Sequence, residues 1–191
     1  MGVERDYVVA TVTYSAHRPY VQRERRLMGE YLAATYPHDR VITGFRLGPT
    51  PILAGGNVPP GVSERYLSSW LLRADAIVMV GPEWQVWEVK NVATGAAIGQ
   101  VEEYAMLLLQ SPEYLAQHGG LVSRHILAGG ITPSAMQMAT QRGINVTLYA
   151  PPWYYADAAN LGANLAQYIV PRSAPVDVVG SHIAQGGVPS S

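Results

Sequence analysis

The chain of 191 residues contains no cysteine and only one lysine. Without cysteine it can form neither disulfides nor thiolate metal sites, and this absence fits the cytosol and the cell exterior equally. Charged residues make up only 14% and the formal net charge is -1, so no overall attraction to nucleic acid or anionic membranes is expected. A polyanion would need a local patch. Arg18, Arg23, Arg25 and Arg26 form one, although they also fit the solvated face of a helix.

Long apolar runs are missing too. No uninterrupted run reaches the length of a membrane span, and the first residues lack the basic and apolar regions of a secretory signal. We therefore expect a soluble, cytoplasmic protein with no membrane partner. The length suits one domain with one core. We expect an N-terminal arm over 1–19, an α/β domain over 20–170 and an extended tail over 171–191.

Apolar spacing along the chain switches between the period of a strand and that of a helix. Glycine and proline clusters separate the segments. The pattern predicts strands over 7–13, 40–45, 74–80, 84–90, 121–129 and 144–150, with helices over 20–36, 63–72, 94–110, 132–143 and 152–169. The segments 74–80 and 84–90 are expected to form a hairpin. This order is typical of an α/β fold with a mixed sheet and helices on both faces.

The single lysine, Lys90, lies two residues after Glu88 in a predicted strand. Side chains two residues apart in a strand share a face, so these two should project together. The hairpin brings Asp75 alongside from the preceding strand. Two carboxylates with free positions between them suit Mg²⁺ or Mn²⁺, which keep several waters and bind substrate phosphate. A lysine beside such a cation orients the attacking water and stabilises developing charge.

The helix over 94–110 adds two polar residues. Gln100 and Tyr104 are four residues apart, so they lie on one helical face, one turn beyond the strand of Glu88. Packed against the carboxylates, they would hold substrate phosphates or water.

Together these residues resemble the PD-(D/E)xK nuclease superfamily, in particular its RecB-like branch, which has a Gln-x-x-x-Tyr motif after the acid-x-lysine strand. The resemblance implies a restriction-endonuclease-like fold, with a core of helix, three-strand meander, helix and further strand, and divalent-metal hydrolysis of phosphodiesters. It implies metal ligation by Asp75 and Glu88, often with the carbonyl of Val89. Lys90 would be the catalytic lysine, with Gln100 and Tyr104 in support.

The family often carries an acidic residue on its first helix. Glu24 lies in the centre of the apolar stripe of the helix over 20–36, whereas Glu30 points to the opposite side. Glu24 is therefore the expected additional metal ligand.

Several other residues have competing interpretations. Arg65 and Arg73 flank the strand of Asp75 and are expected to contact a nucleic-acid backbone, although pairing with Glu64 is the alternative. His125, inside an apolar strand, is expected to be a hydrogen-bonded core histidine. The aromatic residues Trp153, Tyr154 and Tyr155 fit stacking on bases, but packing or a protein interface is favoured.

Two functions remain open at this point. The first is a nuclease that uses Mg²⁺ or Mn²⁺ to hydrolyse phosphodiesters, with DNA as the expected substrate. The second is a non-enzymatic assembly protein on the same fold, such as a phage head-completion or head–tail connector component. That protein would be incorporated in a virus particle and would bind copies of itself or virion partners through its tail. The weak net charge and the few basic residues favour the second function.

Overall fold

The computed structural model describes residues 19–49, 72–117, 119–160 and 167–171. Several predicted features lie outside these ranges: the N-terminal strand over 7–13, Arg65, and the tail from residue 172 onward. The predicted helix over 63–72 also lies outside them, apart from Leu72.

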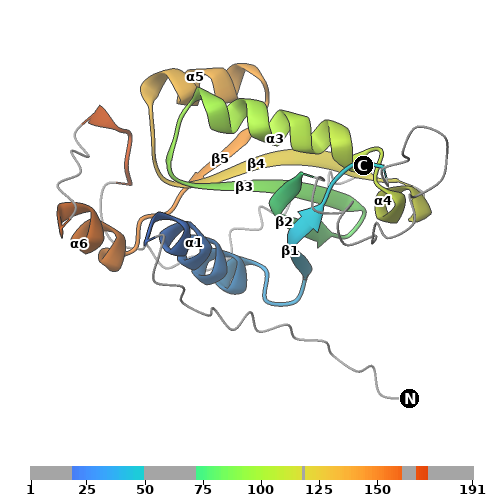
Figure 1. Cartoon of the computed structure of the whole chain (residues 1–191), viewed down its shortest axis with the longest axis horizontal. Coiled ribbons are helices and arrows are strands. Elements are labelled where there is room, and N and C mark those ends of the chain that lie inside the picture. The colour runs from blue at the N-terminus through green and yellow to red at the C-terminus, as the bar shows by residue number, and fades with distance from the viewer. Residues whose placement is uncertain (1–18, 50–71, 118, 161–166, 172–191) are drawn as a thin grey trace, which may run out of the picture.

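Helices and strands follow one another largely as the apolar spacing predicts (Figure 1). They are α1 (Pro19–Thr35), β1 (Arg40–Arg46), β2 (Arg73–Val80), β3 (Glu83–Ala93), α3 (Gly95–Leu108), α4 (Pro112–Ala116), β4 (Leu121–Ile131), α5 (Pro133–Gln141), β5 (Asn145–Leu148) and α6 (Pro152–Asn160). None of these helices is both long and apolar enough to cross a membrane.

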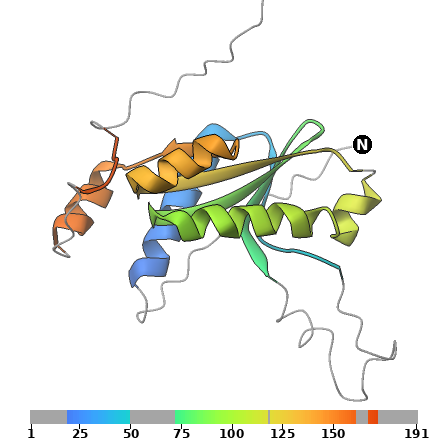
Figure 2. The same ribbon diagram turned by 90° about the horizontal axis from the view of Figure 1, so that it is seen from above.

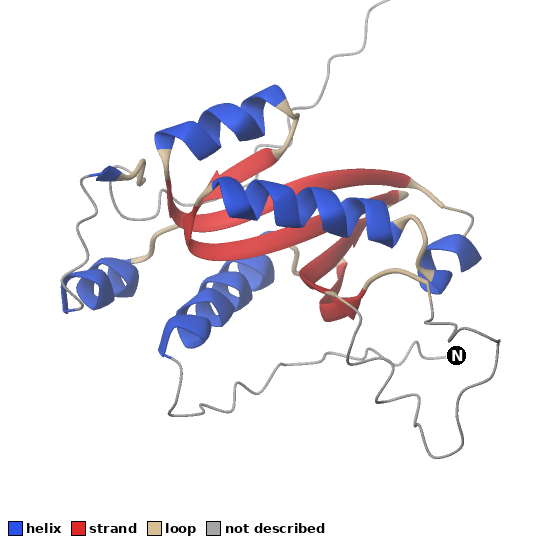
Figure 3. Cartoon of the chain, turned by 45° about the horizontal axis from the view of Figure 1, so that its top comes forward, coloured by secondary structure: helices blue, strands red, loops and turns tan. Residues whose placement is uncertain are grey.

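The strands form one five-stranded sheet in the order β1-β2-β3-β4-β5. The first three strands are an antiparallel meander, and β3, β4 and β5 are parallel to one another. Parallel neighbours need a crossover, which α3 and α5 supply. Figure 2 shows these two helices side by side over one face of the sheet, while α1 lies on the other face in Figure 3. The predicted mixed sheet with helices on both faces is confirmed.

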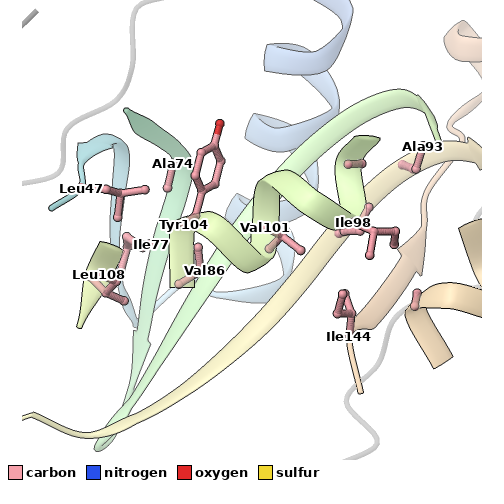
Figure 4. Close-up of a cluster of buried hydrophobic side chains, with 14 of the residues drawn as sticks. Leu47, Ala74, Ile77, Val86, Ala93, Ile98, Val101, Tyr104, Leu108 and Ile144 are labelled. Atoms are coloured by element: carbon pink, nitrogen blue, oxygen red, sulfur yellow. The ribbon is translucent and has the colours of Figure 1, made fainter. Parts of the chain in front are cut away.

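Each face of the sheet has its own apolar core. Val86 of β3 packs with Ile98 and Val101 of α3 in the α3-side core, part of which Figure 4 shows. Trp87 packs with Leu27 of α1 in the α1-side core. Successive side chains of a strand alternate between faces, so the even-numbered residues of β3, which include Glu88 and Lys90, belong to the α3 side.

One predicted boundary is wrong, and one helix was not predicted. The expected helix over 152–169 does not reach its end, because Ile169 forms an antiparallel bridge with Ile131 through backbone hydrogen bonds of 3.0 and 2.8 Å. A β-branched pair just before Pro171 favours this extended backbone. The helix predicted over 94–110 corresponds to α3, but the short helix α4 was not predicted; Ser111 and Pro112 open it, and the proline takes a first-turn position.

The aromatic residues of α6 pack within the protein. The Trp153 indole donates to Glu30 at 2.8 Å, and the buried Tyr154 hydroxyl donates to the Asn91 carbonyl at 2.6 Å. A side chain at Gly129 would lie 2.2 Å from the Tyr154 ring, so only glycine fits beneath it. Trp153 and Tyr154 therefore pack within the fold, as the favoured interpretation expected.

Candidate functional site

The candidate site begins where β2 separates from β3. The antiparallel register runs from Val80–Glu83 to Ala76–Trp87 and would next place Asp75 opposite Glu88. At that point a side chain replaces the backbone acceptor, since the Val89 amide donates to Asp75 Oδ2 at 2.8 Å. The Asp75 carboxylate therefore occupies the edge of β3 that β2 has left.

A second carboxylate reaches the same edge from α1. The Asn91 amide donates to Glu24 Oε1 at 3.1 Å. Amides two residues apart point to the same edge of a strand. The carboxylates of Asp75 and Glu24 therefore accept from successive amides along one edge of β3. In an antiparallel ladder the carbonyl of a residue faces the same side as its amide. The carbonyl of Val89 therefore also faces this edge, next to Asp75.

Glu88 and Lys90 lie beside this edge and form a direct ion pair. The Glu88 side chain is 1% exposed and that of Lys90 is 24% exposed. The second oxygen of Glu88, Oε2, is buried and accepts no hydrogen bond from the described residues. A buried acceptor without a donor costs about 1–3 kcal/mol, and such groups are rare enough to need an explanation.

The two neighbouring carboxylates disturb each other's ionisation. Burial and the charge of Asp75 together raise the pKa of Glu88 to about 7, against the opposing effect of Lys90. Burial also raises the pKa of Asp75, although the Val89 amide, Lys90 and Arg25 oppose this shift. Two like charges in one desolvated place share a proton near neutral pH.

The neighbouring carboxylates raise the pKa values of both Lys90 and Tyr104. Burial lowers the pKa of Lys90, but the hydrogen bond and charge of Glu88, together with Glu24 and Asp75, outweigh burial and the pKa is raised. The pKa of the Tyr104 hydroxyl is raised by burial and by the charges of Glu88 and Asp75. In Figure 4 the Tyr104 ring lies beside Ala74, and its hydroxyl points out of the apolar cluster.

The cluster as a whole carries more negative than positive charge. Glu24, Asp75 and Glu88 surround one ammonium group, that of Lys90. Among the described residues, however, no three acidic or histidine side chains are arranged to share a metal. A pair of carboxylates fits a cation that keeps most of its waters, because Mg²⁺ commonly uses only one or two carboxylates.

The structure gathers most of the predicted site residues. Asp75, Glu88 and Lys90 lie together with Tyr104 from α3 and with Glu24 from α1. Gln100 is half-buried one turn before Tyr104, without a hydrogen bond to the cluster in the described part of the chain.

The remaining acidic and basic candidates lie elsewhere. Glu30 accepts from Arg26 and Trp153 at 2.8 Å each, so it ties α1 to α6. Arg73 is exposed at the start of β2, and Arg65 lies outside the described residues.

Sequence reasoning missed two features of this site. One is the pair of backbone amides at Val89 and Asn91, which become available only because β2 diverges. The other is Arg25, whose charge acts on Asp75. The sequence assigned Arg25 to a basic patch or a solvated helix face and did not place it beside Asp75.

No model of a known protein family matches this chain, and no curated protein or solved structure matches it either. The resemblance to PD-(D/E)xK nucleases therefore stays a prediction from the sequence motifs.

Proposed function

We propose that this protein is a divalent-metal-dependent nuclease that hydrolyses phosphodiester bonds, with DNA as the expected substrate. The observation that carries the proposal is the buried carboxylate of Glu88. One of its oxygens has no donor among the described residues, its neighbour Asp75 is a second carboxylate, and its ion-pair partner is the only lysine of the chain. The order helix, antiparallel meander, helix and parallel strand in the structure is the order that the resemblance implies.

The residues present fit a hard divalent cation. Asp75 and Glu88 would be its ligands, and the Val89 carbonyl faces the same edge. Glu88 Oε2 is the kind of orphaned acceptor that a cation satisfies. Bound there, Mg²⁺ or Mn²⁺ would lower the pKa of water and offset charge on the phosphate. The predicted role of Glu24 as a further ligand stays a prediction, because its Oε1 accepts from the Asn91 amide.

The chain's own residues supply the remaining chemistry. The Lys90 ammonium donates hydrogen bonds to the attacking water or to a non-bridging phosphate oxygen as negative charge develops there. The Tyr104 hydroxyl lies close enough to Glu88 for the Glu88 charge to raise its pKa. In the reaction the water oxygen bonds to phosphorus, the bond from phosphorus to the leaving oxygen breaks, and a proton passes to that leaving oxygen.

Cleavage of plasmid and linear DNA by the full chain tests this proposal. We expect cleavage with Mg²⁺ or Mn²⁺, none with EDTA, and none by Asp75→Asn. Glu113→Gln is the matched control, since it removes an exposed carboxylate from α4. If the wild type cuts neither DNA nor RNA with either metal, the nuclease function is wrong.

A second candidate is the non-enzymatic assembly protein. Several large apolar side chains are exposed at the end of α3, on α4 and at the start of β4, namely Met106, Leu109, Leu115 and Leu121. Exposed apolar patches often mark protein interfaces. Such a protein would belong to a virus particle, whereas the nuclease would act in the cytoplasm. Oligomerisation that Met106→Lys abolishes, in a chain without nuclease activity, would favour this candidate.

A further inference from the structure

Two arginines face each other directly at the end of the sheet that carries the site. Arg46 of β1 and Arg73 of β2 are register partners, and both are exposed. Like charges directly opposite on neighbouring strands are destabilising. Neither arginine has an acidic partner among the described residues, whereas Arg26, Arg124 and Arg142 each lie against a glutamate. Folding alone does not account for this pair.

Both arginines project away from the α3-side core. Arg46 lies between Phe45 and Leu47, and both of these pack into that core. Gly44 makes this possible, because its φ of +63° breaks the alternation of β1. On β2, Ala74 packs into the same core. Since successive side chains of a strand point to opposite faces, Arg73 points away from it. This alternation does not place Asp75, because Ile77, two residues further on, packs into the same core as Ala74.

A third arginine reaches this region from α1. Arg25 is exposed, and its positive charge acts on Asp75. It also has no acidic partner in the described part of the chain. Three exposed arginines, which form no ion pair with another described residue, therefore come from α1, β1 and β2 to the end of the sheet that carries Asp75.

We infer that Arg25, Arg46 and Arg73 bind the phosphates of a nucleic-acid strand on one side of the bond that is cut. This inference rests on the proposed nuclease function and narrows its substrate to a strand that continues past the scissile phosphate. Arginine suits the task because its planar fork binds phosphate in a bidentate way. Arg73 lies two residues before Asp75 on β2, and two residues of a strand span about 6.6 Å. That distance equals about two nucleotide steps, at an axial rise of about 3.4 Å per nucleotide of one strand.

The first measurement is binding of a fluorescent single-stranded oligonucleotide by the full chain in Ca²⁺, over a series of salt concentrations. The quantity measured is the salt slope, that is, the steepness with which the logarithm of the binding constant falls with the logarithm of salt concentration. Each lost phosphate contact should lower this slope by about one. We expect a drop of about two for the double variant Arg46→Gln/Arg73→Gln and about one for Arg25→Gln. Arg40→Gln is the matched control, because Arg40 is also exposed on β1 but at the opposite end of the strand. Unchanged slopes in the double variant overturn the inference.

The second measurement separates this inference from the nuclease function. Wild type and double variant are compared on the oligonucleotide and on bis(p-nitrophenyl) phosphate, a diester without neighbouring phosphates. We expect the loss of kcat/KM on the oligonucleotide to be at least about tenfold larger than the loss on the small diester. Equal losses would contradict a role in binding flanking phosphates. If the wild type cleaves neither substrate but the salt slopes fall as expected, the phosphate surface stands and the nuclease function fails.

Stability provides the last check. Because the opposed arginines repel each other, Arg46→Gln/Arg73→Gln should unfold at the same temperature as the wild type or a higher one. A lower Tm together with weaker binding would indicate a structural role and would contradict the inference.

Discussion

Strand β3 carries one buried polar cluster in its first half and another in its second half. In the first half, Gln85 Oε1 accepts from the Tyr36 hydroxyl at 2.9 Å and from the Trp87 indole at 3.3 Å. In the second half, Glu88 is in an ion pair with Lys90, yet its Oε2 has no donor among the described residues. The side chains of Tyr36, Gln85 and Trp87 are uncharged and make these hydrogen bonds beside Glu83, whose carboxylate accepts from the Gln85 amide at 3.4 Å. The second cluster is charged and incompletely satisfied.

Burial also shifts pKa values in opposite directions in the two clusters: it lowers that of His125 and raises that of Glu88. His125 stacks on Trp87 with ring centroids 4.5 Å apart and bonds Ser123 Oγ at 2.8 Å. Burial lowers its pKa to about 4, so it is neutral near pH 7. This confirms the expected hydrogen-bonded histidine. A satisfied neutral network rigidifies a fold, whereas buried charges with raised pKa values mark candidate functional sites.

The largest expected effect is on cleavage by Lys90→Arg. Arginine keeps the positive charge but replaces a compact ammonium by a rigid fork, which cannot take the same place beside Glu88. We expect cleavage to fall by at least about 100-fold, as for the loss of one well-placed donor in a transition state. Initial rates on a labelled DNA duplex measure this effect, with Arg40→Gln, at an exposed position of β1, as the control. Full activity of Lys90→Arg would remove the lysine from the mechanism.

In the neutral cluster the expected effect is on stability instead. Gln85→Ala leaves the Tyr36 hydroxyl and the Trp87 indole without their acceptor. Each unsatisfied buried donor costs about 1–3 kcal/mol, so we expect the free energy of unfolding to fall by roughly 2 kcal/mol or more. Urea unfolding at pH 7 measures it. Gln110→Ala, which removes an exposed hydrogen bond to the Met106 carbonyl, should change it little.

Metal binding should distinguish the two clusters as well. Ligands that bind only the folded state stabilise it, by about 2.7 kcal/mol at a hundred times the dissociation constant. We expect Mg²⁺ to raise Tm in the wild type and in Gln85→Ala, but not in Asp75→Asn. Proton release should accompany binding near pH 7, because the cation replaces the proton shared by Asp75 and Glu88. An equal Tm increase in Asp75→Asn would locate the cation elsewhere.

The sequence predicted much of this site because period-two alternation survives in β3. That alternation alone places Glu88 and Lys90 on one face, and the hairpin brings Asp75 near them. The paired arginines could not be predicted, because Gly44 reverses the side-chain alternation of β1 and its positive φ is not readable from apolar spacing. The capping of the Val89 amide by Asp75 was equally hidden, since it depends on the point at which two paired strands separate.

The smallest expected effect is the pH dependence of stability, where the clusters act in opposite directions. Glu88 has a folded-state pKa of about 7, above its ordinary 4.5. The folded state therefore holds more protons between these values, and this group's contribution is lost as pH rises through that window. His125 has a folded-state pKa of about 4, below its ordinary 6.5. The folded state then holds fewer protons, so its contribution is lost as pH falls from 6.5 toward 4.

Single variants separate these opposing slopes. In Glu88→Gln the loss of stability between pH 4.5 and 7 should disappear, because the group that binds the proton is gone. In His125→Gln the loss on acidification should shrink instead. Urea unfolding at half-unit pH steps measures both curves. If the stability of Glu88→Gln depends on pH as that of the wild type does, the shared proton does not reside on the Asp75–Glu88 pair. The two halves of β3 would then differ in hydrogen bonding alone.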